Sequence, residues 1–292
     1  MPYPIPSLPP EAFTRLPEPE ALDALQAAAA AAYGVSDPAM AVAAPGTQAL
    51  ISLLPLLLPQ RSVTVLEPTY AEHAAAWRNA GADVRVVLPP FPKGKGAVVL
   101  CNPNNPDGRR VAVPDLLALA ARRSLLIVDE AFADFEPQDS LAPHLPLPGA
   151  IVLRSFGKAY GLAGLRLGFA LAAPALAARI RAALGPWAVS GPALHVGAAA
   201  LADTAWRDAA GRRLRADSAA LDGLLARAGI TAIGGTTLFR LVDTPDAAGW
   251  ADRLGRAGIL VRSFADAPTR LRFGLPSAAG WDRLASALEV RR

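Results

Sequence analysis

The stretch Ser155–Gly168, "SFGKAYGLAGLRLG", places Lys158 at the head of an apolar, glycine-rich run. The chain carries nearly all of its positive charge as arginine, and its other two lysines, Lys93 and Lys95, lie in "FPKGKG", which predicts a solvated loop. An amine in an apolar site loses solvation of its charged form and becomes available as a nucleophile that forms Schiff bases. We therefore interpret Lys158 as a catalytic residue in a largely apolar site rather than as a surface lysine.

The composition is that of a globular protein with about two domains. The chain has 292 residues, of which 52% are hydrophobic and 18% charged, and its net charge is +4. The arginines are scattered and form no basic stripe with aromatic residues, which argues against a nucleic-acid partner. The longest apolar run, "ALISLLPLLL", is too short and too broken by proline to span a membrane.

Two features of the sequence bear on the compartment. A single cysteine, Cys101, excludes an internal disulfide and is typical of a reducing environment. The first residues, "MPYPIPSLPP", have neither the basic region nor the apolar region of a signal peptide. We therefore expect a cytoplasmic protein.

The pattern of predicted strands and helices divides the chain into two domains. Between residues 35 and 189, strands alternate with helices of about ten to fifteen residues, which predicts βαβ units and a mainly parallel sheet. Residues 190–292 combine a long helical region with short strands and predict a smaller α+β domain. Residues 1–34 contain a helix that ends at Gly34, and we expect this segment to pack with the smaller domain.

Five polar segments fall at or just beyond the ends of predicted strands. In an open parallel sheet, ligands bind in the crevice at the carboxyl ends of the strands. These segments are therefore expected to converge on one site. They are "PGT" (45–47), "EPTY" (67–70), "NPNNP" (102–106), "DEAF" (129–132) and "RSFGK" (154–158).

Some of these residues are suited to holding an anion. Gly46 and Thr47 lie where a strand turns into a helix, and backbone amides at such a place bind phosphate. A plain helix start is the simpler explanation of these two residues taken alone. Ser155 lies three residues before Lys158 and Arg166 eight residues after it, and together they are placed to hold an anion beside the amine.

Asp129 follows a strand of Leu, Ile and Val, where an unpaired carboxylate is costly. A cationic ring nitrogen would pair with it, and a helix cap or a metal ligand are the alternatives. The three histidines, His73, His144 and His195, are far apart in sequence and lack the spacing of a metal site. We therefore predict structural roles for them and no metal.

The set "NPNNPDG", "VDEAF" and "SFGKAYGLAGLRLG", in this order and spacing, resembles the fold-type I pyridoxal-phosphate enzymes of the aminotransferase class I/II superfamily. The resemblance covers nearly the whole chain. It implies a fold-type I architecture, with a large α/β domain of mainly parallel sheet and a smaller α+β domain at the C-terminus. It also implies pyridoxal 5'-phosphate as the cofactor and a homodimer as the assembly.

The same resemblance implies roles for individual residues. Lys158 would hold the cofactor covalently, Asp129 would pair with its pyridinium nitrogen, and Tyr70 would stack on its ring. Arg272 of "LRFGLP" would bind the substrate α-carboxylate in a bidentate manner, and Arg270, on the same strand face, could take its place. The other cofactor contacts would be Gly46, Thr47, Gln48, Ser155 and Arg166 to its phosphate, and Asn105 to its phenolic oxygen.

Within the class, "APGTQALISLLP" (44–55) and "LRFGLPSAAGWDRL" (271–284) are similar to the threonine-phosphate decarboxylases of cobalamin synthesis. The chain also resembles the histidinol-phosphate aminotransferases, which usually carry a tyrosine where this chain has Phe132. The decarboxylases normally begin some tens of residues earlier, with an arm that helps close the site over the substrate.

The resemblance implies decarboxylation of L-threonine O-3-phosphate to 1-amino-2-propanol phosphate. The alternatives are an aminotransferase of the histidinol-phosphate type and, from another class, a catalytically silent or cofactor-sensing homologue. The motifs indicate the cofactor but not the bond that breaks. A phosphorylated amino-acid substrate would need further arginines, for which Arg270, Arg262 and Arg154 are the candidates because each lies on or at the end of a predicted strand.

Overall fold

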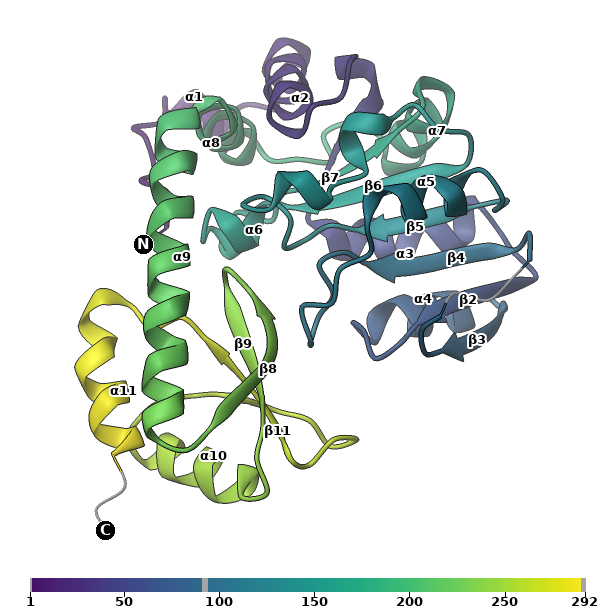
Figure 1. Ribbon diagram of the computed structural model, residues 1–292. Coiled ribbons are helices and arrows are strands. Elements are labelled where there is room, and N and C mark those ends of the chain that lie inside the picture. The colour runs from purple at the N-terminus through teal and green to yellow at the C-terminus, as the bar shows by residue number, and fades with distance from the viewer. Residues whose placement is uncertain (1, 91–93, 290–292) are drawn as a thin grey trace. The chain divides into compact units, whose positions relative to one another are not determined.

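The computed structural model describes residues 2–90 and 94–289, which form two compact units (Figure 1). Lys93 lies outside the described residues, and Lys95 is exposed, as predicted for a solvated loop. Within the described residues, no helix has the length and apolar character needed to cross a membrane. In their described parts, the larger unit comprises residues 2–104 and 110–204, and the smaller unit residues 105–109 and 205–289.

The larger unit is built on a seven-stranded sheet with the order β1-β7-β6-β5-β4-β2-β3. Strands β2 to β6 pair in parallel, and only β7 runs antiparallel to its neighbours β1 and β6. The predicted mainly parallel sheet is therefore confirmed. The strands are β1 (Ala41–Ala44), β2 (Ser62–Leu66), β3 (Asp83–Val87), β4 (Ala97–Cys101), β5 (Leu126–Asp129), β6 (Ala150–Ser155) and β7 (Gly168–Ala172).

Helices cover both faces of this sheet. On one face, α3 and α7 pack with the strands around a buried core that includes Leu50, Trp77 and Ile127. On the other face, α2 brings Tyr33 against Phe169 of β7, with ring centroids 5.7 Å apart. The helices of this unit are α1 (Glu11–Thr14), α2 (Pro19–Tyr33), α3 (Thr47–Leu57), α4 (Glu72–Asn79), α5 (Val113–Ala120), α6 (Phe156–Ala159), α7 (Pro174–Leu184) and α8 (Gly191–Ala202).

The N-terminal segment lies in the larger unit, although the sequence suggested that it packs with the smaller domain. Helix α2 ends as expected at Gly34, which has a positive φ of 73°. It packs on α8, as does α1, and α8 also belongs to the larger unit. The smaller unit begins after Thr204, not at residue 190. The boundary lies after α8 because this helix is buried along most of its length by contacts within the larger unit.

The smaller unit consists of a four-stranded antiparallel sheet, with the order β10-β11-β9-β8, and three helices. Its own core is formed where α9, α10 and α11 cover this sheet, with Phe273 and Leu254 fully buried. Its elements are α9 (Thr204–Arg227), β8 (Thr231–Thr236), β9 (Phe239–Asp243), α10 (Ala247–Arg256), β10 (Arg262–Ser263), β11 (Arg270–Gly274) and α11 (Trp281–Leu288). The predicted smaller α+β domain is present, with a later start.

Candidate active site

The ends of β5 and β6 place their polar residues on one face of the sheet. Successive side chains of a strand point to opposite faces. Ile127 of β5 and Leu153 of β6 belong to the core under α3. Asp129 and Ser155, two residues further along each strand, therefore lie on that same face at the carboxyl edge of the sheet. This is the edge at which the sequence predicted a site.

Asp129 is a buried carboxylate that is held on both oxygens. It is 5% exposed. Its Oδ2 lies 2.8 Å from Nε2 of His73, and its Oδ1 accepts a hydrogen bond of 3.0 Å from the backbone amide of Ala131. The side chain is therefore fixed in place by the fold of the larger unit.

His73 is the partner of Asp129 that the sequence did not reveal. It lies in the first turn of α4 and is 2% exposed. Burial by itself would lower the pKa of His73, but the hydrogen bond to Asp129 and the neighbouring Cys101 raise this pKa to about 10. The contact with Asp129 therefore favours the protonated form of His73. The only hint in the sequence was its position three residues after Tyr70, which places both near one turn of a helix.

Cys101 completes this buried group. It is paired with Asp129 in the register of β4 and β5, so the two side chains lie on the same face. The ligand atoms of His73, Cys101 and Asp129 lie within 4.8 Å of one another. Cys101 is a free, buried thiol.

An anion cradle forms where β1 leads into α3. Gly46 caps α3 with a φ of 84°, and a Cβ at this position would lie 2.7 Å from Nη2 of Arg166. A Cβ on Gly168 would likewise lie 2.6 Å from the backbone nitrogen of Thr47. Two glycines thus allow the Arg166 guanidinium and the first amides of α3 to approach each other closely. Helix N-termini and arginine are the groups that bind phosphate.

Arg166, the arginine of this cradle, has an unusual backbone conformation. Its φ is 53°, in the left-handed region that residues other than glycine seldom adopt. Its Nη1 donates a hydrogen bond of 3.3 Å to the carbonyl of Ala163, and the side chain is otherwise exposed. Ser155 is half-buried at the end of β6.

Lys158 lies on α6, directly after β6, and is exposed. Its Nζ lies 5.8 Å from the centroid of the Phe132 ring, within the range of a cation–π contact. The expectation of a largely apolar site around this amine is therefore wrong for the chain as it stands. The apolar residues of "SFGKAYG", such as Phe156 and Tyr160, are buried on their own and do not enclose the lysine.

Tyr70 precedes α4 and is 40% exposed. Its hydroxyl donates a hydrogen bond of 3.2 Å to Oε1 of Gln48, and Nε2 of Gln48 lies 3.4 Å from Glu72. Burial, followed by the charges of Glu72 and Asp129, raises the pKa of Tyr70. The side chain of Gln48 therefore anchors Tyr70, while its backbone belongs to the first turn of α3.

The other asparagines of "NPNNP" hold the loop rather than a ligand. Asn102 is fully buried and bonds the backbone of Val111 and Asp139. Asn104 donates to the carbonyl of Pro68 at 2.7 Å and accepts from Thr69 at the same distance. Asn104 thus ties the loop after β4 to the loop after β2, and Asn102 ties it to the backbone at Val111 and Asp139.

In the smaller unit, Arg272 and Asn105 are neighbours. Nη1 of Arg272 donates a hydrogen bond to Oδ1 of Asn105, and the guanidinium lies 5.2 Å from the centroid of the Phe239 ring. Burial and the charge of Arg262 lower the pKa of Arg272. The register of β10 and β11 places Arg262 directly opposite Arg272.

Arg270 differs from Arg272 in having a carboxylate partner. Its Nε lies 3.5 Å from Oδ2 of Asp243 on the neighbouring strand β9. The positive charge of Arg270 is therefore balanced locally, whereas Arg272 faces another arginine. This geometry favours Arg272 over Arg270 as the group that meets an incoming anion.

Arg154 does not fit the role of a substrate-binding arginine, so that prediction is wrong. Its side chain is 3% exposed and lies near the carboxylates of Glu130 and Asp134. It points to the face of the sheet opposite Ser155, because the two residues are adjacent in one strand.

Comparisons with known proteins agree with this architecture. A family model described as "Aminotransferase class I and II" matches residues 10–288. A threonine-phosphate decarboxylase from Pseudomonas aeruginosa is 44% identical, and one from a Sinorhizobium species is 47% identical; each alignment covers 98% of this chain and 88% of the relative. The crystal structure of histidinol-phosphate aminotransferase from Sinorhizobium meliloti in complex with pyridoxal-5'-phosphate is 26% identical, with a TM-score of 0.81, and the match covers 94% of this chain and 82% of that one.

Proposed function

The chain belongs to the aminotransferase class I and II family, and we propose that it is a pyridoxal-phosphate-dependent decarboxylase of L-threonine O-3-phosphate. The products would be CO2 and 1-amino-2-propanol phosphate, as in cobalamin synthesis. The similarity to two threonine-phosphate decarboxylases along 98% of the chain is the observation that carries this choice of reaction.

The described residues fit pyridoxal 5'-phosphate. The cradle of Gly46, Thr47 and Arg166 suits a phosphate, because the Arg166 guanidinium lies beside the N-terminus of α3, and both groups bind anions. Asp129 is an anchored buried carboxylate, as a cationic ring nitrogen requires. Lys158 has an accessible amine and lies on α6, the short helix that follows the neighbouring strand β6.

When bound, pyridoxal 5'-phosphate supplies an electron sink for the pair left on Cα as CO2 departs. Asp129 would pair with the ring nitrogen and hold a proton there, and His73 holds Asp129 in position. Lys158 would hold the cofactor covalently and would be the group that returns a proton to Cα. Tyr70 would stack on the ring, and Gln48 holds Tyr70 through a hydrogen bond to its hydroxyl.

We assign the substrate's two anionic groups to arginines of the smaller unit. Arg272 would bind the α-carboxylate, and Asn105 would keep its amide nitrogen for the cofactor's phenolic oxygen while its Oδ1 accepts from Arg272. Arg262, exposed and directly opposite Arg272, is the candidate for the substrate phosphate. Two like charges opposite each other destabilise a strand pair, and a substrate with two anionic groups would relieve this repulsion.

The aminotransferase reaction is the second candidate. The Sinorhizobium meliloti structure supports it, but at 26% identity that comparison is weaker than the similarity to the decarboxylases. Phe132 also favours the decarboxylase, because the histidinol-phosphate relatives usually have a tyrosine there. A silent or sensing homologue is the third candidate, and it would bind the cofactor without turnover.

One assay separates these candidates. Purified protein with pyridoxal 5'-phosphate is given L-threonine O-3-phosphate without 2-oxoglutarate, and we expect release of CO2. Plain L-threonine should be a poorer substrate by roughly 30- to 150-fold, the effect of about 2–3 kcal/mol from the missing charged contacts. Turnover that requires 2-oxoglutarate and yields glutamate would favour the aminotransferase, and bound cofactor without turnover would favour the silent homologue.

We further propose a homodimer in the cytoplasm. The larger unit has an apolar groove of about 620 Å³ beside Trp187, which is 58% exposed, and a partner chain would cover such a surface. The single buried cysteine suits a reducing compartment. Sedimentation of the purified protein at micromolar concentration tests the dimer, and a fully active monomer would contradict it.

A further inference from the structure

A second polar cluster lies behind the candidate site, on the opposite face of the sheet. Glu130 follows Asp129 in the chain, and Arg154 precedes Ser155. Because side chains alternate along a strand, the site residues point to one face and these two point to the other. The cluster therefore consists of the immediate neighbours of two site residues.

Glu130 is completely buried, and its carboxylate is fully engaged. Oε2 accepts a hydrogen bond of 2.6 Å from Ser140, and Oε1 accepts one of 2.7 Å from the amide of Leu141. The same Oε2 lies 3.5 Å from Nε of Arg154, and the backbone amide of Glu130 donates to the carbonyl of Leu153 at 2.9 Å. The ends of β5 and β6 are thus joined by both a backbone bond and an ion pair.

Arg154 extends these contacts to two further segments. Its Nη1 lies 3.9 Å from Asp134, and its guanidinium carbon lies 4.6 Å from the centroid of the Tyr33 ring on α2. Burial opposes its charge, but Glu130 and Asp134 raise the pKa of Arg154 above its ordinary value. Arg154 is therefore a permanent buried cation at the centre of the cluster.

The cluster also reaches the segment that carries Lys158. Tyr160, two residues after Lys158, is 1% exposed and is one of the groups that raise the pKa of Arg154. Its ring stacks on Phe156 at 4.4 Å, and its carbonyl accepts a bond of 2.8 Å from the amide of Tyr3. The buried face of the lysine segment thus packs beside the ion pair.

We propose that the Glu130–Arg154 ion pair is a positioning element that fixes Asp129 and Lys158 relative to each other. This inference rests on the proposed cofactor. The two residues touch neither cofactor nor substrate; they act through the chain neighbours that do. A catalytic contact misplaced by about 1 Å can lose on the order of 10²-fold in rate, so fixing the two strand ends has a measurable consequence.

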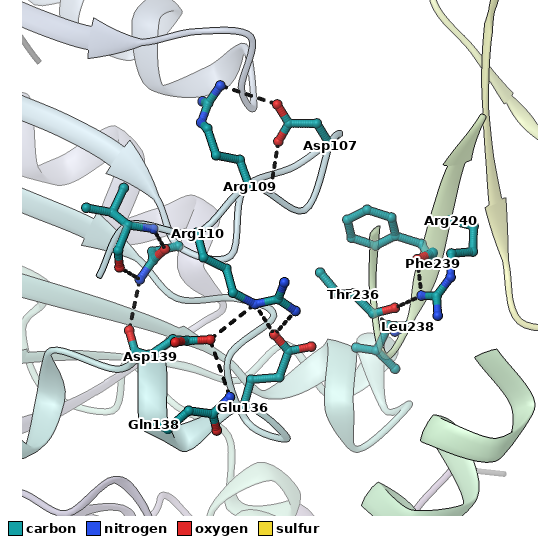
Figure 2. A network of polar contacts seen from close by, with 12 residues as sticks. Asp107, Arg109, Arg110, Glu136, Gln138, Asp139, Thr236, Leu238, Phe239 and Arg240 are labelled. Atoms are coloured by element: carbon teal, nitrogen blue, oxygen red, sulfur yellow. Dashed lines mark hydrogen bonds and ion pairs between the residues drawn. The ribbon is translucent and has the colours of Figure 1, made fainter. Parts of the chain in front are cut away.

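Replacing both members tests positioning apart from stability. Well-packed apolar residues in place of a buried ion pair often preserve stability, so Glu130→Met/Arg154→Met should unfold without cofactor within about 5 °C of the parent. The matched control is Arg110→Met. Arg110 is a half-exposed arginine paired with Glu136 and Asp139 (Figure 2), and neither β5 nor β6 contains any of these three residues.

The readouts are the affinity for pyridoxal 5'-phosphate and the pH midpoint of the visible absorbance of the loaded protein. We expect the double variant to bind the cofactor at least about tenfold more weakly and to shift the midpoint by about half a pH unit or more. Arg110→Met should change neither. Parental affinity and midpoint in the double variant would overturn the proposal, as would equal changes in Arg110→Met.

Two further measurements complete the test. If the double variant does not fold, Arg154→Lys, which keeps the charge but not the planar fork, should weaken cofactor binding by about threefold, and parental behaviour would overturn the proposal. A parent that binds the cofactor but does not decarboxylate threonine phosphate overturns the proposed reaction alone. A parent that takes up no cofactor overturns both.

Discussion

The two central residues of the candidate site, Asp129 at the end of β5 and Lys158 on α6 just after β6, differ in their exposure to solvent. Asp129 is 5% exposed, with both oxygens engaged and His73 beside it. Lys158 is exposed, and its amine lies over Phe132. The fold thus prepares the carboxylate before any ligand binds, whereas the lysine stays accessible. A carboxylate that is already fixed in place can pair with a cationic ring nitrogen, and an accessible amine can attack an incoming carbonyl.

The largest effect is expected when the amine of Lys158 is removed. Lys158→Ala should abolish covalent attachment of pyridoxal 5'-phosphate and lower turnover by at least about 10³-fold, because both the nucleophile and the proton donor are lost. Borohydride reduction followed by peptide mapping measures the attachment. Lys95→Ala, which changes an exposed loop residue, is the control. Cofactor found on Lys93 or Lys95 would show that Lys158 has been misassigned.

Removing the charge of the prepared carboxylate should have the next largest effect. Asp129→Asn keeps the shape of the side chain but leaves both His73 and the ring nitrogen without an anion. Without that anion the ring nitrogen loses its proton and the cofactor is a poorer electron sink, so we expect turnover to fall by about 10²-fold or more, equivalent to about 2.7 kcal/mol. Asp139→Asn, near the surface, is the control. Turnover within about threefold of the parent, under one kcal/mol, would exclude this role for Asp129.

The alternation of strands and helices predicted the mainly parallel sheet, and the apolar strand before Asp129 indicated that this carboxylate is buried. These patterns did not predict His73, because the contact with Asp129 joins residues 56 positions apart. They also could not place α8, because a helical pattern says that a face is buried but not against which neighbour. The exposure of Lys158 was missed for a related reason: apolar neighbours in sequence can bury one another instead of the residue between them.

His73 gives a pH-dependent test of how the carboxylate is prepared. Its pKa is raised from 6.5 to about 10 in the folded protein. A raised pKa contributes stability that is complete below about pH 6.5 and is lost as the pH rises toward 10, since the folded state holds the proton longer. The free energy of unfolding should therefore fall more steeply between pH 7 and 10 in the parent than in His73→Gln, by up to about 1.4 kcal/mol per pH unit. Chemical denaturation of cofactor-free protein measures this, and parallel curves would refute it.

We expect the smallest effect from substitutions of Tyr70. Its ring is exposed, as Lys158 is, but its side chain is held by a hydrogen bond, as that of Asp129 is. Its hydroxyl bonds Gln48 at 3.2 Å, and its ring is 40% exposed. Tyr70→Phe keeps the stacking face and loses one partly exposed hydrogen bond, so cofactor affinity should fall by only about twofold. Gln48→Ala should cost the same, and the double variant no more, because both remove one interaction. Tyr70→Leu, which removes the aromatic face, should cost more. A loss above about tenfold in Tyr70→Phe would mean that the hydroxyl itself contacts the ligand and that Gln48 is not its main partner.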